Sequence, residues 1–215
     1  RVLRVLNHEP PKPGKDIYLS LDVSLQAVAE AAFEGESGAL VALDPSTGEV
    51  LAFVSMPRFD PNLFVDGMRV NEYHTLFDSP ERPLFNRALA GQYPPGSTVK
   101  PFFGLASLEF DTELAKGQTT CQGWYSLPNH QHRYRDWKRS GHGTVNLSQA
   151  ISQSCDVYFY ELALELGIDR MHDYMTAMGF GRQTRIDLSG ENTGLMPSRE
   201  WKRLARSEPW YPGET

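Results

Sequence analysis

A serine and a lysine three residues apart carry the strongest chemical signal in this sequence. Ser97 and Lys100 stand in the stretch YPPGSTVKP at residues 93–101. The prolines and the glycine predict a stiff turn, and the apolar residues 102–108 that follow continue at a helical period. Residues at positions i and i+3 of such a helix share one face, and Pro101 is tolerated in its first turn. The spacing therefore predicts a serine nucleophile with an amine within its reach.

A serine hydroxyl is a weak nucleophile and needs a base within hydrogen-bond distance. A lysine can be that base when it is neutral, a form that burial or a neighbouring positive charge favours. The N-terminus of a helix also brings a backbone N–H, here that of Ser97, that can stabilise an oxyanion. The four-residue pattern Ser-x-x-Lys occurs in many unrelated proteins, so it needs support from elsewhere in the chain.

A second candidate group is Ser154-Cys155-Asp156, at the junction of two predicted helices. A hydroxyl and a carboxylate two residues apart can both face a cleft there. Ser-x-Asn or Ser-x-Asp is the expected second part of an active site built on Ser-x-x-Lys. Serine and aspartate are also the residues that usually cap helix N-termini, so an ordinary cap is the alternative interpretation.

The elements that precede the serine turn predict an α+β layer fold. A short strand is predicted at residues 17–21, a helix from Asp22 to Phe33, and a hairpin of strands 38–43 and 49–55. Both hairpin strands are almost continuously apolar, which predicts a sheet covered on both faces. Residues 57–92 carry many turn formers and are predicted to form an irregular excursion.

The second half of the chain is predicted to be mostly helical. The serine turn leads into a helix that ends near Phe110, and residues 117–143 predict a long polar loop or small subdomain. Further helices are predicted at residues 147–153, 157–166 and 169–178, and another near residue 198.

Composition narrows the function classes. The 215 residues are 40% hydrophobic, which is enough for a substantial core and predicts one large domain or one with a small appendage. The net charge of −6 argues against a nucleic-acid-binding protein, because such proteins usually carry a basic surface that binds phosphates. No apolar run approaches the roughly 18–20 residues that span a bilayer. Two cysteines are too few for a disulfide framework.

Several stretches together resemble the transpeptidase domain of class B penicillin-binding proteins. The motif at 93–101 is similar to their first active-site motif, residues 38–55 resemble the hairpin that opens their catalytic domain, and FDPNLF at 59–64 follows as in class B members. RYRDWK at 133–138 with GHG at 141–143, and MPSREWK at 196–202, resemble the penicillin-binding protein 2 subfamily, the elongation transpeptidases. The implied fold is that of penicillin-binding proteins and serine β-lactamases, an antiparallel sheet packed with helices plus an all-helical subdomain.

The resemblance implies a peptidoglycan D,D-transpeptidase. Ser97 would attack the penultimate D-Ala carbonyl of a stem pentapeptide, expel D-Ala and pass the acyl group to an amine on a neighbouring stem. Lys100 would take the serine proton. Ser154 with Lys100 would relay a proton to the leaving group, and Asp156 would orient the network. Catalysis would need no cofactor, and β-lactams, which mimic D-Ala-D-Ala, would acylate Ser97.

The resemblance also implies a location and partners. It suggests the periplasmic face of the bacterial inner membrane, with an anchor outside this sequence. The expected partners are the stem pentapeptide and its lipid-linked precursor, β-lactam antibiotics, a membrane glycosyltransferase and elongation-complex proteins. Nucleic acid is not expected as a partner.

Two departures from the family pattern bear on the domain organisation. The second motif ends in Asp156 where many relatives have asparagine, and the third motif, Lys-Thr-Gly or Lys-Ser-Gly on a strand, does not occur in these residues. We expect residues 1–16, rich in proline and polar residues, to be a linker from an absent N-terminal region. Residues 17–215 are expected to form the N-terminal and central part of the transpeptidase domain, truncated before the third motif. Half of the oxyanion hole and the substrate-carboxylate site would be missing with that motif.

Two thiols, an imidazole and a carboxylate bracket the polar region 117–143 and predict a structural zinc site: Cys121, Asp136, His142 and Cys155. Four protein ligands would leave no open position for water, so the ion would be structural and not catalytic. Because its ligands come from the polar region and from Cys155, it would link that region to the helix that carries Ser154. In the family that this sequence resembles, some members hold zinc at this position and others lack the cysteines. A Cys121–Cys155 disulfide and two free core thiols are the alternatives. His130 and His132 could compete as ligands, but solvation on a polar loop is the simpler expectation.

Two other functions fit parts of the same pattern. A serine β-lactamase or β-lactam sensor of the same fold would be acylated in the same way and would differ in the hydrolysis of the acyl-enzyme. A non-catalytic cell-wall scaffold would use the fold to bind partners, and the presence of Ser97, Lys100, Ser154 and Asp156 argues against it.

Overall fold

A computed structural model describes residues 10, 12–65 and 67–215 of the protein. Most of the predicted linker at residues 1–16 lies outside this range, and its described residues have no regular secondary structure. The chain forms two compact units, residues 1–91 and residues 92–215. Within the described residues, no helix combines the length and the apolar character needed to cross a bilayer.

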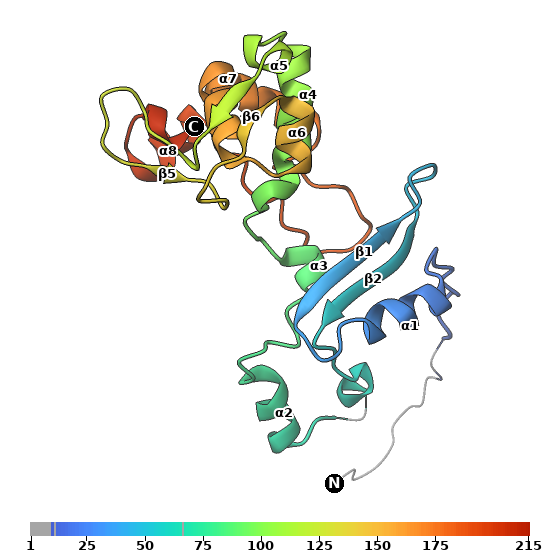
Figure 1. The fold of residues 1–215 in the computed structure, drawn as a ribbon. Coiled ribbons are helices and arrows are strands. Elements are labelled where there is room, and N and C mark those ends of the chain that lie inside the picture. Colours follow the sequence, from blue (N-terminus) through green and yellow to red (C-terminus); the bar gives the residue numbers. More distant parts are fainter. Residues whose placement is uncertain (1–9, 11, 66) are drawn as a thin grey trace. The chain divides into compact units, whose positions relative to one another are not determined.

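The first unit is built around an antiparallel hairpin, β1 (Gly38–Leu43) and β2 (Val50–Met56), with helix α1 (Val23–Ala31) packed on it (Figure 1). The register pairs Val41 with Phe53 and shifts at Ala42 and Leu43. Ala29 of α1 shares a small core with Ala52 and Val54 of β2. The prediction of an apolar hairpin next to a helix is confirmed.

The prediction of a strand at residues 17–21 is wrong. These residues are extended but belong to no ladder, and Ile17, Tyr18 and Leu19 are exposed. The edge of β2 bonds instead to the start of α1: the Asp22 N–H donates to Leu51 O, and the Gln26 side chain bonds both the N–H and the C=O of Phe53. A side-chain amide thus satisfies the backbone groups that a third strand would otherwise pair.

In this unit α1 covers one face of the hairpin. The other face is covered only in part, where Ser55 Oγ donates to Phe85 O and accepts from the Arg87 N–H, so the prediction of two covered faces holds only in part. Leu40 and Ala42 of β1 pack against the small core, whereas Val41 and Leu43 are exposed. Residues 57–92 contain more regular structure than predicted: a 3-10 turn η1 (Pro61–Phe64) and helices α2 (Val70–Phe77) and α3 (Arg87–Ala90). The Glu72 carboxylate accepts from the Arg69 N–H at the start of α2 and stabilises that helix among the turn formers.

The second unit is mostly helical. Its helices are α4 (Lys100–Glu109), α5 (Glu113–Lys116), α6 (Leu147–Ser152), α7 (Asp156–Ala177) and α8 (Arg199–Arg206), with 3-10 turns η2 (Gly96–Val99) and η3 (Pro212–Glu214). Helices α4 and α7 pack against each other around a core that includes Tyr158 and Leu162. Gly167 interrupts α7 with φ 73° and ψ 156°, at the point where the sequence predicts two helices.

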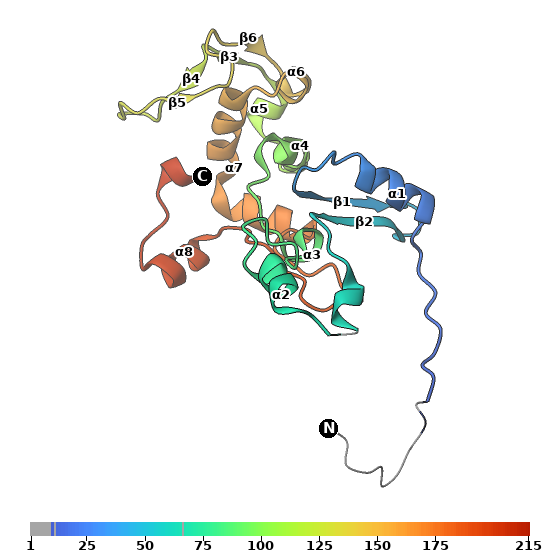
Figure 2. The same cartoon turned by 90° about the horizontal axis from the view of Figure 1, so that it is seen from below.

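The polar region 117–143 folds into two small antiparallel pairs beside α7 (Figure 2). Strand β3 (Thr119–Cys121) pairs with β6 (Gly143–Val145), and β4 (Trp124–Tyr125) pairs with β5 (Tyr134–Arg135). Gly123 and Gly141 allow residues 121–123 to pass close to residues 139–141: a Cβ on Gly141 would lie 2.2 Å from the carbonyl oxygen of Cys121, and one on Gly123 would lie 2.2 Å from that of Arg139. Of the two alternatives for this region, a long polar loop or a small subdomain, the structure therefore shows the second, built from short strands.

Candidate active site

Ser97 lies in the 3-10 turn η2, one residue after Gly96, and not in the first turn of α4 as the spacing predicted. Gly96 has φ 58°, a left-handed conformation that glycine adopts without steric cost. Side chains at i and i+3 eclipse in a 3-10 turn, so Ser97 and Lys100 still share a face. The Ser97 side chain is exposed and available to a substrate.

Lys100 is buried, with 7% of its surface exposed. Its Nζ donates to the carbonyl oxygen of Ser154 at 2.9 Å, to Ser154 Oγ at 3.0 Å and to Asp156 Oδ1 at 2.5 Å. An ammonium has three donors, and these three acceptors use them all. The two sequence motifs, which lie more than 50 residues apart, therefore meet at the amine of Lys100.

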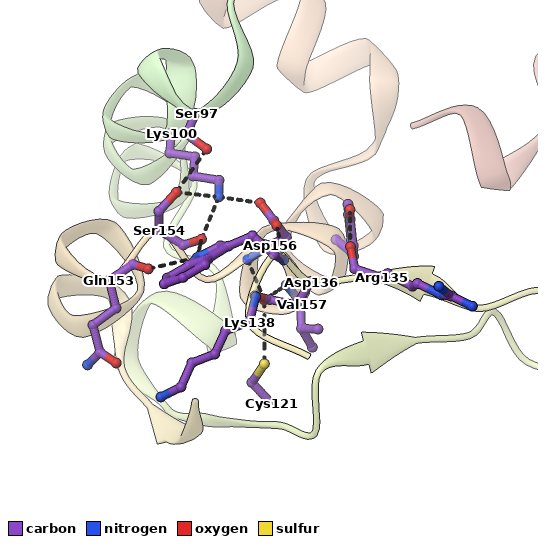
Figure 3. A network of polar contacts seen from close by, with 12 residues as sticks. Ser97, Lys100, Cys121, Arg135, Asp136, Lys138, Gln153, Ser154, Asp156 and Val157 are labelled. Carbon is purple, nitrogen blue, oxygen red and sulfur yellow. Dashed lines mark hydrogen bonds and ion pairs between the residues drawn. The ribbon is translucent and has the colours of Figure 1, made fainter. Parts of the chain in front are cut away.

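Ser154 connects this amine to the candidate nucleophile. Its hydroxyl accepts from Lys100 Nζ and donates to Ser97 Oγ at 2.8 Å (Figure 3). The lysine thus reaches Ser97 through a second hydroxyl, whereas the spacing alone suggested a direct approach. Hydroxyl protons rotate, so the same chain can also run from Ser97 through Ser154 to a neutral amine. The arrangement can therefore take a proton from Ser97 and make it nucleophilic.

Ser154 occupies a tight turn between α6 and α7 with φ 53°. This left-handed conformation costs a non-glycine residue roughly 1–2 kcal/mol. The turn is closed by backbone bonds from Ser154 N–H to Ile151 O and from Cys155 N–H to Ala150 O. Strained backbone of this kind is common where a side chain must be aimed at a reacting group.

The alternative interpretation of Ser154 and Asp156 as an ordinary helix cap is wrong. The residue in the N-cap position of α7 is Cys155, and its side chain makes no capping bond. Asp136, from the polar region, caps the helix instead: its Oδ2 accepts from the N–H groups of Asp156 at 2.8 Å and Val157 at 3.2 Å. The side chains of Ser154 and Asp156 are left to face Lys100.

A pocket of about 290 Å³ opens beside this network. Its polar wall includes Ser97, Lys100 and Asp156, and its apolar wall is formed by residues of α4 and α7 that include Phe103, Phe159 and Leu162. Tyr160 also lines the pocket, and burial, with smaller effects from Asp156 and Asp136, raises the pKa of its phenol. The site thus combines a hydroxyl that is linked by hydrogen bonds to an amine with an apolar recess, as expected for binding an organic substrate.

Comparison with known proteins identifies the family. The family model described as penicillin binding protein transpeptidase domain matches residues 38–208. The chain belongs to this family. It is 47% identical over its whole length to the peptidoglycan D,D-transpeptidase MrdA of Acinetobacter baumannii, of which it spans 32%. The chain therefore covers about a third of that relative.

Solved penicillin-binding protein structures share the fold. A crystal structure of Pseudomonas aeruginosa PBP2 in complex with WCK 5153 is 54% identical with a TM-score of 0.90, and the match covers 94% of this chain and 46% of that one. A complex of PBP2 and MreC from Helicobacter pylori is 36% identical with a TM-score of 0.86, covering 90% of this chain and 36% of that one. The transpeptidase fold class and the resemblance to the penicillin-binding protein 2 subfamily are thus confirmed.

The four residues predicted as zinc ligands come together in this penicillin-binding protein. One ligand atom from each of them lies within 4.8 Å of every other: Cys121, Asp136, His142 and Cys155. Cys121 Sγ is 3.5 Å from both Asp136 Oδ2 and His142 Nδ1, and His142 Nδ1 is 3.6 Å from Asp136 Oδ1. Tetrahedral zinc with ordinary bond lengths separates its ligand atoms by about 3.3–3.8 Å. The donor set therefore suits zinc, and the three separations among Cys121, Asp136 and His142 are close to those of a tetrahedral site.

The chemistry around these ligands agrees with a closed cation site. Although burial acts to raise the pKa of Asp136, hydrogen bonds from the N–H groups of Lys138, Val157 and Asp156 hold it below the usual value. His142 directs Nδ1 at the other ligands. Its buried Nε2 has no hydrogen-bond partner among the described residues, so these residues do not supply the second hydrogen bond that a metal-bound imidazole usually makes. Both cysteines are free thiols, so the disulfide alternative is not met in this structure. Burial raises the pKa of Cys155 to about 12, and a bound cation would offset that.

Sequence reasoning missed two contributions to the site. It assigned Asp136 only to the metal and did not predict its cap on α7, because a cap supplied by a distant loop leaves no local signal. It noted Trp137 only as part of a family motif, yet the Trp137 N–H donates to Asp156 Oδ2 at 3.1 Å. The polar competitors His130 and His132 lie outside the ligand cluster, as expected.

Proposed function

We propose that this chain is the part of a peptidoglycan D,D-transpeptidase that forms the acyl-enzyme. The observation that carries the proposal is the hydrogen-bonded chain from Ser97 Oγ through Ser154 Oγ to Lys100 Nζ, at the mouth of a pocket. The name of the A. baumannii relative supports the same activity. Because the chain spans about a third of that relative, the complete reaction belongs to the longer protein.

Ser97 is the proposed nucleophile. Its proton would pass to Ser154 Oγ as the Ser154 proton passes to the neutral amine of Lys100, while Ser97 Oγ attacks the penultimate D-Ala carbonyl of a stem pentapeptide. The Ser97 N–H would supply one donor of the oxyanion hole. Collapse of the tetrahedral intermediate breaks the peptide bond to the terminal D-Ala, whose amine takes a proton back through Ser154. Asp156 orients Lys100 in both directions, and no step uses a cofactor.

The acyl-enzyme would then be attacked by an amine on a neighbouring stem, which forms the cross-link and frees Ser97. Residues 17–215 would supply the first two motifs. A third motif, Lys-Thr-Gly or Lys-Ser-Gly, would come from a further part of the domain and would complete the oxyanion hole and the site for the substrate carboxylate. β-Lactams would acylate Ser97 in place of the stem peptide.

The cysteine, histidine and aspartate cluster is proposed to hold a structural zinc ion. Its four ligands would be Cys121, Asp136, His142 and Cys155. The ion would fix the polar region against the start of α7, whose first turn carries Asp156. It would take no part in proton transfer.

The location and partners follow from the proposed reaction. The enzyme would act at the periplasmic face of the bacterial inner membrane on stem peptides of lipid-linked precursor and nascent peptidoglycan. A membrane glycosyltransferase that makes the glycan and proteins of the elongation complex would be its partners. The complex of H. pylori PBP2 with MreC supports this, since that PBP2 is a structural neighbour of this chain.

The decisive experiment is labelling of the full-length protein with a fluorescent penicillin. We expect one label per protein, located on Ser97 by peptide mass spectrometry and abolished by Ser97→Ala. Thr98→Ala is the matched control, because Thr98 Oγ1 bonds to the neighbouring Pro95 carbonyl and not to the network. A label that persists for many minutes supports a transpeptidase, and rapid release would identify a β-lactamase instead. No label on Ser97 would refute the proposal.

A further inference from the structure

The peptide carbonyl of Ser154 is held from two sides. On one side Lys100 Nζ donates to it at 2.9 Å. On the other side the indole Nε1–H of Trp137 donates to it at 3.1 Å and to the preceding carbonyl of Gln153 at 3.2 Å. The first donor belongs to the proposed mechanism. The second donor has no role in it so far.

Trp137 also bonds to the other residue of the second motif. Its backbone N–H donates to Asp156 Oδ2 at 3.1 Å, while Asp156 Oδ1 bonds to Lys100. One residue therefore contacts both the strained turn at Ser154 and the carboxylate that orients Lys100. Its ring lies across from His142 with centroids 5.5 Å apart.

Burial does not explain the presence of this tryptophan. Trp137 is 65% exposed, so its large apolar surface contributes little to the core. Its indole N–H nevertheless bonds to two backbone carbonyls at a turn where the backbone has φ 53°. Indole Nε1 is the one polar atom of the Trp137 side chain, and it bonds to the strained turn that carries Ser154. This suggests that Trp137 holds the turn in position and adds little to the stability of the fold.

We propose that Trp137 is a positioning residue for acylation, acting through its indole N–H on the Gln153–Ser154 turn that aims the Ser154 hydroxyl at Ser97. The proposal rests on the proposed function, because it assigns Trp137 a part in the same acylation step. With the indole N–H in place, the Ser154 carbonyl is fixed between two donors and the Ser154 hydroxyl stays within 2.8 Å of Ser97 Oγ.

Two substitutions distinguish the effect of the indole N–H from the effect of the aromatic surface. Trp137→Phe keeps an aromatic surface and removes the donor. Trp137→His removes most of that surface but keeps a donor, because imidazole Nε2, like indole Nε1, is two bonds from Cγ. Trp124→Phe is the matched control: Trp124 lies in the neighbouring β4 strand, and its ring packs against Arg133 with the guanidinium 4.2 Å from the centroid.

The readout is the acylation of the full-length protein by a fluorescent penicillin, followed by stopped flow above neutral pH and over a range of penicillin concentrations. We expect Trp137→Phe to lower the first-order acylation constant about tenfold, as for one lost hydrogen bond, with the non-covalent dissociation constant unchanged. Trp137→His should recover most of that loss. Trp124→Phe should match the parent protein in both constants and in melting temperature.

Three results would overturn the proposal. Equal acylation by the parent and Trp137→Phe would show that the N–H does no positioning. A larger loss for Trp137→His than for Trp137→Phe would assign the effect to the ring face and hence to substrate contact. A loss that tracks a lower melting temperature in both variants would make the role structural. Failure of the proposed function looks different, because Ser97 of the parent would then take no label at all.

Discussion

Ser154→Ala removes the hydroxyl between Ser97 and Lys100 and leaves the rest of the network in place. The substitution deletes the 2.8 Å bond to Ser97 Oγ and the 3.0 Å bond from Lys100 Nζ. Lys100 keeps its bonds to the backbone carbonyl of residue 154 and to Asp156. The amine therefore stays where it is, and only the connection to Ser97 is lost.

The size of the effect follows from what that connection does. Proton transfer by a positioned group is worth about 10²–10⁴-fold in rate. Because Lys100 remains nearby and could act on Ser97 through a water molecule, we expect the lower part of this range, about 10²–10³-fold, or about 2.7–4.1 kcal/mol of activation free energy. The free energy of unfolding should change by only about 1 kcal/mol, since Ser154 is only partly buried and the bonds lost are ordinary hydrogen bonds.

The assay is the second-order rate constant for acylation of the full-length protein by a fluorescent penicillin. Ser152→Ala is the matched control, because Ser152 lies two residues away and, among the described residues, its hydroxyl bonds only to Gln149 O in the same helix. The control should acylate at the parent rate. If Ser154→Ala lowers the rate by less than about threefold, Lys100 acts on Ser97 without the relay and the reasoning is refuted.

Ser154→Gly sharpens the same experiment. Glycine adopts φ 53° without the steric cost that alanine meets there, although it also gains entropy in the unfolded chain. We expect the glycine variant to be as slow as the alanine variant in acylation but about 0.5–1 kcal/mol more stable in urea unfolding. A glycine variant less stable than the alanine variant would show that the turn is not strained.

Three further predictions concern stability and metal. Leu162 is fully buried, so Leu162→Ala should lower the free energy of unfolding by about 2–5 kcal/mol. The same change at the exposed Leu108 should lower it by less than about 1 kcal/mol. Equal losses for the two variants would contradict the assigned core. Metal analysis of the full-length protein should find one equivalent of zinc that Cys155→Ser abolishes, and protein with neither metal nor free thiols would favour the disulfide. Hydrogen bonding from Lys202 lowers the pKa of Glu214 in the folded protein. The ionised Glu214 therefore stabilises the fold above the ordinary carboxyl pKa, and this stabilisation is lost as the pH falls through the lowered pKa. The difference in melting temperature between the parent and Glu214→Gln should therefore shrink on acidification, and a constant difference would refute the assignment.

Local signals in the sequence predicted most of the regular elements. Asp22 caps α1 as expected, since its carboxylate accepts from two N–H groups of the first turn. Asn146 and Gln149 form a reciprocal cap at the start of α6, within a residue of the predicted boundary. Gly167 interrupts α7 where the sequence predicted a helix to end. In each case the determining contact lies within a few residues, so the sequence pattern contains it.

Two of the differences from prediction come from contacts between distant residues, and one comes from the choice between two local helix types. Residues 17–21 have the composition of a strand, but the edge of β2 that they would pair with is bonded by Gln26. The 3-10 geometry at Ser97 is likewise not visible in the spacing, because both helix types place residues i and i+3 on one face. The roles of Asp136 and Trp137 depend on a polar region that folds back onto α7. Hydrophobic periodicity and helix-capping residues in a sequence do not show that a distant segment will fold back onto a helix.

The start of α7 joins the two predicted sites into one structure. Cys155, a candidate zinc ligand, stands between Ser154 and Asp156, so the φ of Ser154 and the direction of the Cys155 side chain are set by the same turn. Asp136, another ligand, caps the helix at Asp156 and Val157. Any movement of Asp136 would therefore shift the helix end that holds Asp156 against Lys100. In the proposed mechanism Ser97, Ser154 and Lys100 move the proton, and a cation bound by the cluster would act on acylation only through this turn, by holding Asp136 and Cys155 in place.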